Sequence, residues 1–211
     1  MEFEYIRPEE IELRSFEIIR SELNCLLPED IAPVVLRCIH TTADFDYAEN
    51  LYFSENVIPL AMQLLRQGCT VVTDTNMAKA GISKTALTKL GCEIRCFMTD
   101  EDIARTAKEQ GITRASASVE KAAAYGNSLI YVVGNAPTAL IRICELSTKG
   151  IFTPALVIGM PVGFVNVVSA KEMLIASGIP CIVARGRKGG SNVAAAAVNA
   201  LLYQACDEKR V

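Results

Sequence analysis

Five short runs of β-branched and other apolar residues are spread along the chain, and segments with helical periodicity separate them. The runs cover residues 70–73, 93–97, 129–133, 155–158 and 181–184. Each is mostly apolar, which is typical of strands that are buried on both faces of a sheet. Apolar residues recur at helical spacing in 54–67, 136–149, 170–177 and 192–204. This alternation predicts an α/β fold with a mostly parallel, open sheet flanked by helices on both faces.

The N-terminal part of the chain differs from the rest, because helical features dominate roughly its first 60 residues. Pro8, followed by Glu9 and Glu10, is a helix-start signal. We therefore expect a helical N-terminal segment ahead of the sheet. The length of 211 residues suits one domain with a sizeable core. Since no linker, repeat or low-complexity tract divides the sequence, we expect residues 1–211 to form a single domain.

The charge balance limits the partners of such a chain. Its formal net charge is −3, which argues against nucleic acid or an anionic membrane as the main partner. No apolar stretch is long enough to predict a transmembrane helix. The acidic start, residues 1–5, lacks the features of a secretion signal. We therefore expect a cytoplasmic protein.

The sequence lacks the spacing of cysteine and histidine side chains that a zinc site requires. It holds eight cysteines and one histidine, but no Cys-x-x-Cys pattern and no second histidine that could complete a zinc site. In a cytoplasmic protein such cysteines are small buried side chains or free thiols. We expect no metal site in the protein itself.

Glycine-bearing loops follow three of the five predicted strands. They occupy residues 134–138, 159–164 and 185–192. Open parallel sheets bind ligands beyond the carboxyl ends of their strands, and glycine lets the backbone approach a ligand closely. The sequence therefore predicts a wide cleft lined by these three loops.

The loop after the last predicted strand carries the clearest anion signal. Arg185, Arg187 and Lys188 precede a helix whose cap is expected at Ser191 or Asn192. Cations next to a helix start favour carboxylates or phosphates, although a plain solvated loop is the alternative. The order of residues fits neither the P-loop nor the dinucleotide fingerprint, so we expect no nucleotide cofactor.

His40 is the only histidine of the chain. Imidazole has an unperturbed pKa close to neutrality, so it suits both the donation and the acceptance of a proton. Arg37 lies three residues earlier and shares a helix face with His40, where it could anchor a substrate carboxylate. The alternative is a structural histidine packed beside a helix.

Further candidate contacts are scattered along the chain. Ser15 is a mild misfit in the middle of a predicted helix with an apolar face of Ile11, Phe16, Ile18 and Ile19, and a solvent-facing serine is the common explanation. Asp74 ends a predicted strand, the favoured place for a functional acid, or else it makes a turn or a cap. The remaining candidates for substrate binding are Arg14, Thr41, Arg114 and Asn135.

With these residues in view, the chain resembles the precorrin-8X methylmutase family, which includes cobalt-precorrin-8 methylmutases. The resemblance extends over nearly the whole sequence and rests on several motifs together. They are residues 5–8, 14–16, 37–40, 73–74, 134–140, 159–165 and 185–191.

The resemblance implies an isomerase of cobalamin biosynthesis that moves a methyl group from carbon 11 to carbon 12 of (cobalt-)precorrin-8. It implies no methyl donor and no cofactor, and any cobalt belongs to the substrate. By the same resemblance His40 protonates the macrocycle and later removes the proton, while Ser15 and Arg37 bind the substrate. Arg114 and the Arg187 loop are further contacts.

The resemblance also implies a homodimer with active sites at or near the subunit interface, and hand-over to other enzymes of the pathway. The stretch after His40, residues 41–47, is similar to that of the cobalt-containing, oxygen-independent members, which favours cobalt-precorrin-8 as the substrate. Two alternatives remain. One is a non-catalytic corrinoid carrier, and the other is a doubly wound enzyme for a phosphorylated metabolite.

Overall fold

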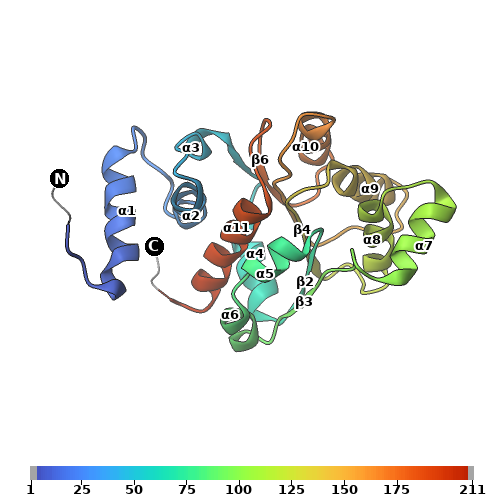
Figure 1. Cartoon of the computed structure of the whole chain (residues 1–211), viewed down its shortest axis with the longest axis horizontal. Helices are drawn as coiled ribbons and strands as arrows, with labels where there is room; N and C mark the ends of the chain where they lie inside the picture. Colours follow the sequence, from blue (N-terminus) through green and yellow to red (C-terminus); the bar gives the residue numbers. More distant parts are fainter. Residues whose placement is uncertain (1–3, 209–211) are drawn as a thin grey trace.

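A computed structural model describes residues 4–208 of the chain (Figure 1). Its centre is one six-stranded sheet with the strand order β1-β6-β5-β4-β2-β3. The strands are β1 (Leu51–Phe53), β2 (Thr70–Thr73), β3 (Glu93–Arg95), β4 (Leu129–Val133), β5 (Leu156–Gly159) and β6 (Cys181–Ala184). All neighbours are parallel except β1, which is antiparallel to β6. The α/β class and the five strands expected from the sequence are confirmed.

Residues along the central strands alternate between two hydrophobic cores. Ile130 and Val132 of β4 pack into the core on one face, whereas Tyr131 and Val133 pack into the core on the other. Every residue of β4 is buried. Successive side chains of a strand point to opposite faces, so a strand covered by helices on both sides must be apolar throughout.

Helices cover both faces of the sheet. The first core holds residues from α2 (Ala32–Thr42), α4 (Val57–Arg66), α6 (Lys84–Lys89) and α11 (Ser191–Ala205). The second core holds residues from α7 (Glu101–Gln110), α8 (Arg114–Ala123), α9 (Pro137–Thr148) and α10 (Val167–Ala176). The short helix α5 (Asn76–Gly81) follows β2.

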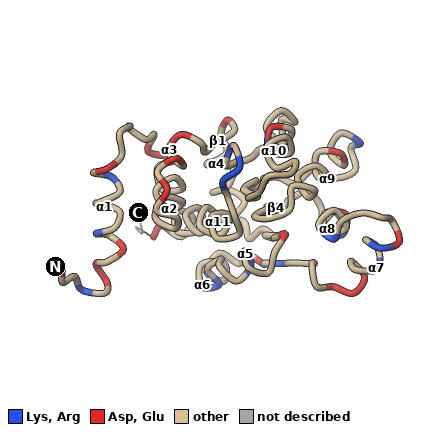
Figure 2. Tube along the Cα trace, turned by 45° about the horizontal axis from the view of Figure 1, so that its top comes forward, with Lys and Arg blue, Asp and Glu red and all other residues tan. Residues whose placement is uncertain are grey.

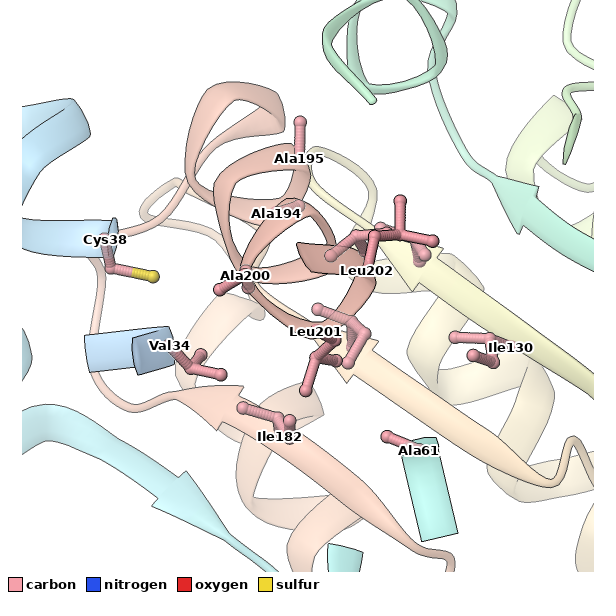
Figure 3. Close-up of a cluster of buried hydrophobic side chains, with 14 of the residues drawn as sticks. Val34, Cys38, Ala61, Ile130, Ile182, Ala194, Ala195, Ala200, Leu201 and Leu202 are labelled. Carbon is pink, nitrogen blue, oxygen red and sulfur yellow. The ribbon is translucent and has the colours of Figure 1, made fainter. Parts of the chain in front are cut away.

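Helix α11 is central to the first core. Figure 3 shows its residues Ala194, Ala200 and Leu201 among side chains from α2 and from the sheet. Alanines on several faces of the helix leave room for close neighbours, so α11 packs against α2, α4 and α5 at once. The carboxyl ends of the strands and the start of α11 are thereby held next to α2.

The N-terminal segment is largely helical, as expected, with η1 (Pro8–Glu10), α1 (Ile11–Glu22), α2 and α3 (Tyr47–Asn50). Strand β1 is the exception, since the sequence suggested only helix in this region. Its three residues are too few to show a periodic pattern, and pairing with β6 decides their conformation. The expected apolar face of α1 is also partly wrong, because Phe16 and Ile19 are buried but Ile11 and Ile18 are exposed.

Candidate active site

The three glycine-bearing loops meet at the carboxyl edge of the sheet. The amide of Gly190 donates to the carbonyl of Met160 at 2.8 Å, and the amide of Gly163 donates to that of Arg187 at 3.1 Å. A Cβ atom on Gly134 would lie 2.6 Å from the Cα atom of Ser191, so only glycine fits there. The three loops therefore lie together, joined by tight backbone contacts. The wide cleft that the sequence predicts between them stays a prediction.

Asp74 shapes the first of these loops from beneath. Its carboxylate accepts hydrogen bonds from the amides of Gly134, Asn135 and Ala136 at 2.8, 2.9 and 2.8 Å. The residue is 1% exposed, and burial raises the pKa of Asp74 while the three amides oppose that rise. The sequence suggested a substrate contact at Asp74. The structure corrects this, because the carboxylate is covered and its oxygens face the loop backbone.

Ser191 also faces the protein interior. Its hydroxyl lies 2.8 Å from that of Thr75, and the residue is buried. Ser191 is the first residue of α11, whereas Gly190 occupies the cap position and makes no side-chain cap hydrogen bond. The expected cap at Ser191 or Asn192 is therefore wrong, because Gly190 has a φ of 131°, which favours glycine, and its amide bonds to Met160 just ahead of the helix.

Lys171 of α10 supports the basic loop, and the sequence motifs did not reveal it. Its ammonium donates to the carbonyls of Gly186 at 2.9 Å and Lys188 at 2.8 Å. The side chain is 0% exposed. Burial lowers the pKa of Lys171 to about 8. Within residues 4–208 no carboxylate pairs with this buried lysine, which is rare, and its hydrogen bonds tie α10 to the basic loop.

The three cations of the basic loop have different partners. Lys188 forms ion pairs with Asp44 at 2.6 Å and Asp46 at 2.5 Å, which ties the loop to the segment after α2. Arg185 lies 3.6 Å from Glu172 of α10. The guanidinium of Arg187 stacks over the exposed ring of Phe164 at 5.4 Å. Figure 2 shows the blue residues of this loop between the N-terminal helices and α10.

His40 lies in the last turn of α2, which ends at Thr42 before Ala43 adopts a left-handed conformation. Its exposed imidazole packs on the ring of Phe16 from α1, with 5.0 Å between ring centroids. His40, Arg37 and Thr41 line one pocket of about 280 Å³. The structure thus brings together three of the side chains that the sequence suggested.

Arg37 forms the inner wall of this pocket. The residue is 7% exposed, and its guanidinium lies 4.8 Å from the ring centroid of Phe16 and 5.2 Å from that of Tyr203. It also forms an ion pair with Glu12 of α1. Stacked and paired in this way, Arg37 holds α1, α2 and α11 together beneath His40.

The opposite wall comes from α5 and α11, and of its residues the sequence motifs suggested only Asn192, in the loop 185–192. The residues of this wall are Gly81, Asn192, Ala195, Ala196, Asn199 and Tyr203. Asn192, Asn199 and Tyr203 recur at spacings of seven and four residues on a mostly apolar helix, so they share a face. That polar stripe was the available signal for this wall.

Four other suggested contacts lie outside this pocket. The hydroxyl of Ser15 donates to the carbonyl of Ile11 at 2.9 Å. Arg14 forms ion pairs with Glu4 at 2.9 Å and Glu17 at 3.3 Å. Asn135 is exposed on the loop after β4. Arg114 begins α8, which packs in the second core, on the other face of the sheet from α2 (Figure 1).

The described residues contain no cluster of three or more His, Cys, Asp or Glu side chains that could hold a metal ion. Within the same part of the chain, no helix is both long and apolar enough to span a membrane. The fold and the pocket define an α/β protein with one imidazole at the rim of a cavity that also contains a buried guanidinium. An imidazole can transfer protons and a guanidinium can bind anionic groups, so this pocket is the candidate active site.

Comparison with known proteins identifies the family. The family described as precorrin-8X methylmutase matches residues 10–204. The cobalt-precorrin-8 methylmutase of Salmonella typhimurium is 44% identical over 93% of this chain and 95% of its own. The precorrin-8X methylmutase of Pseudomonas aeruginosa is 36% identical over 94% of this chain and 97% of its own. A crystal structure of the Thermus thermophilus precorrin-8X methylmutase superposes with a TM-score of 0.87 at 37% identity, covering 94% and 97% of the two chains.

The chain belongs to the precorrin-8X methylmutase family. It is an isomerase of cobalamin biosynthesis that transfers a methyl group within one molecule. The corrinoid-carrier alternative is not favoured.

Proposed function

We propose that this enzyme moves a methyl group from carbon 11 to carbon 12 of a precorrin-8 substrate, with His40 as the acid–base residue. The observation that carries this proposal is the position of the single imidazole, exposed at the rim of the pocket it shares with Arg37 and Thr41. Protonation makes the conjugated macrocycle electron-poor and eases the migration of the methyl group. Removal of the same proton afterwards restores the conjugation.

Contacts between Phe16 and His40 support this role. The ring of Phe16 covers one side of the imidazole and is itself fixed by the guanidinium of Arg37. Packing of this kind limits the rotation of the imidazole, so its exposed edge is presented to the pocket. Thr41 adds a hydroxyl next to it. A proton donor that is held in place in this way needs little reorganisation when the substrate binds.

The carboxylates of the macrocycle are proposed to contact several polar groups around the loops. Arg187 is the best placed cation, since within residues 4–208 it forms no ion pair and stacks only on Phe164. Asn135 is exposed and can donate a hydrogen bond, and the partly exposed Ser15 can do so by turning its hydroxyl away from the carbonyl of Ile11. Lys188 acts through its ion pairs with Asp44 and Asp46, and Arg14 through those with Glu4 and Glu17.

Arg114 is assigned to the substrate site of a second subunit. Its helix packs on the other face of the sheet from α2, so it does not line the His40 pocket of its own chain. The proposal therefore includes a homodimer in which residues 1–211 fold as one domain.

Mixing His40→Ala and Arg114→Gln proteins tests it, because one site of each hybrid dimer would be intact. We expect part of the activity to return on mixing. No recovery in confirmed hybrid dimers, with each parent inactive, would remove Arg114 from the partner's site.

Cobalt-precorrin-8 is proposed as the substrate, since the 44% identical Salmonella typhimurium relative is named for it. The cobalt would then be part of the substrate, and no cofactor is needed by the proposed proton transfers. Action in the cytoplasm and hand-over of the product to other enzymes of the pathway complete the proposal.

Conversion of authentic cobalt-precorrin-8, followed by visible absorption, tests the reaction. The wild-type protein should convert the substrate to the corrin, whereas His40→Ala should bind it and leave it unconverted. Exposed Arg105→Gln on α7 is the matched control and should behave as wild type. Turnover by His40→Ala at the wild-type rate would disprove the role of His40. If metal-free precorrin-8 is converted faster than cobalt-precorrin-8, the cobalt-containing substrate proposed here is wrong. Competition by inorganic phosphate without corrinoid binding would favour the phosphorylated-metabolite reading.

A further inference from the structure

Two Gly-Cys pairs precede neighbouring strands at the edge of the sheet opposite the glycine-bearing loops. Gly68 and Cys69 come directly before β2, and Gly91 and Cys92 come shortly before β3. Both glycines are left-handed, with φ values of 79° and 68°. A Cβ atom on Gly68 would lie 3.0 Å from the carbonyl oxygen of Gly91, so the two turns pack directly on each other. This packing fixes the positions of both cysteines.

The strand register places Cys69 opposite Cys92. Thr70 of β2 is paired with Glu93 of β3 in a parallel ladder. The amide of Glu93 also donates to the carbonyl of Cys69 at 3.2 Å, which extends the ladder by one residue. Paired residues of neighbouring strands lie about 5 Å apart at Cα, within the range of about 4.4 to 6.8 Å that a disulfide requires.

The two side chains also point the same way. Cys69 is part of the first hydrophobic core, and Cys92 packs against that core from its edge. Cys69 is 9% exposed, whereas Cys92 is partly exposed. The thiol of Cys92 donates to the carbonyl of Leu65 at 3.3 Å. The neighbouring Cys69 thiol lowers the pKa of Cys92, whereas the interaction with Cys92, together with burial, raises the pKa of Cys69. Cys92 is thus the more accessible member of the pair and the one whose thiolate forms more readily.

We propose that Cys69 and Cys92 form an oxidisable dithiol that closes to an intramolecular disulfide when a small-molecule disulfide is present. The Cys92 thiolate attacks one sulfur of the oxidant, which gives a mixed disulfide and releases one thiol. The Cys69 thiol then loses its proton and attacks the Cys92 sulfur, which closes the Cys69–Cys92 bond and releases the second thiol. Two cysteine thiols are oxidised, and one disulfide oxidant is reduced to two thiols.

This dithiol is separate from the methylmutase site. Both cysteines lie at the amino ends of their strands, whereas the three loops follow the carboxyl ends, and neither cysteine lines the His40 pocket. The disulfide joins two turns that already touch, so we expect closure to leave the site unchanged. Turnover of the oxidised protein is therefore expected to equal that of the reduced protein. The proposal stands or fails independently of the role of His40.

Incubation of the whole protein with oxidised glutathione, followed by alkylation and peptide mass mapping, tests this proposal. We expect a peptide linked through Cys69 and Cys92, which disappears after reduction. In Cys69→Ser, Cys92 should retain a glutathione adduct, whereas in Cys92→Ser the buried Cys69 should be alkylated only after unfolding. Cys25→Ser, which removes an exposed thiol, is the control and should still close the bond.

Three results would overturn the proposal. One is wild-type protein that keeps both thiols free in excess oxidant. Another is a disulfide in which Cys92 is joined to the neighbouring Cys206 instead of Cys69. The third is a glutathione adduct on Cys92 in wild type that never resolves into the linked peptide. The principal measurement uses the wild-type protein, so a folding defect in one of the variants cannot decide the outcome.

Discussion

Replacement of the buried Lys171 by methionine is expected to change how the stability of this protein depends on pH. Methionine has a similar length and no branching, but it carries neither charge nor hydrogen-bond donor. In the wild type the ammonium is 0% exposed, and the carbonyls of Gly186 and Lys188 accept its hydrogen bonds. The substitution therefore removes a buried charge and leaves two carbonyl groups without this donor.

The size of the effect follows from the pKa of Lys171. Burial lowers this pKa from 10.5 to about 8. Such a decrease corresponds to about 3 kcal/mol, because one pH unit is worth about 1.4 kcal/mol. Below about pH 8 the side chain is charged in the folded and the unfolded chain, and the whole cost of burial opposes folding. As the pH rises towards 10.5, the folded chain loses its proton first and this cost disappears.

The free energy of unfolding of the wild type should therefore rise with pH relative to Lys171→Met. Urea unfolding of both proteins should show that, between about pH 7 and about pH 9.5, the free energy of unfolding of the wild type rises by about 2 kcal/mol relative to that of Lys171→Met. At about pH 7 the two should lie within about 2 kcal/mol, since loss of the hydrogen bonds offsets removal of the buried charge. Other titrating groups are common to both proteins and cancel. Exposed Lys84→Met is the matched control and should show no such change. A wild-type-minus-variant difference that stays constant over this interval would refute the reasoning.

Three further outcomes are expected. Asp74→Asn keeps the shape of the side chain but places an amide donor against the backbone amides of loop 134–136. Urea unfolding should therefore show that the free energy of unfolding falls by about 2–4 kcal/mol. The exposed control Asp30→Asn should stay within about 0.5 kcal/mol of wild type. Gly134→Ala should be poorly folded by circular dichroism, because its methyl group would meet the backbone of Ser191, and a native spectrum and melting temperature would contradict this. Arg187→Gln should raise KM for the corrinoid roughly tenfold with a smaller change in kcat, as expected for loss of one charge-assisted contact, and an unchanged KM in steady-state assays would remove Arg187 from the substrate site.

Local sequence patterns were sufficient for most of the fold. The apolar runs and their spacing predicted five of the six strands, since a strand buried on both faces must be apolar whatever its neighbours are. Strand β1 escaped prediction because its three residues owe their conformation to pairing with β6. Local patterns also placed His40 and Arg37 on one helix face, because a spacing of three residues is a property of the helix itself.

The roles of buried polar groups could not be predicted in this way. Asp74 ends a strand, as a catalytic acid often does, but its carboxylate binds three amides of a loop that begins sixty residues later. Lys171 sits on a helix without any motif, and its importance depends on two carbonyls from another loop. Such roles depend on which groups meet in space, and one-dimensional spacing carries no information on that.

The α/β class, the three strand-end loops and the single imidazole could all be predicted from the amino-acid sequence, because periodicity, glycine positions and residue identity are local. What these features face depends on how the elements pack. Packing of α11 against α2 joins Tyr203 and Asn199 to His40 in one pocket, and it leaves Arg114 on the other face of the sheet. Burial and hydrogen bonding over long sequence separations depend on how whole helices and strands pack, so local patterns could not predict them.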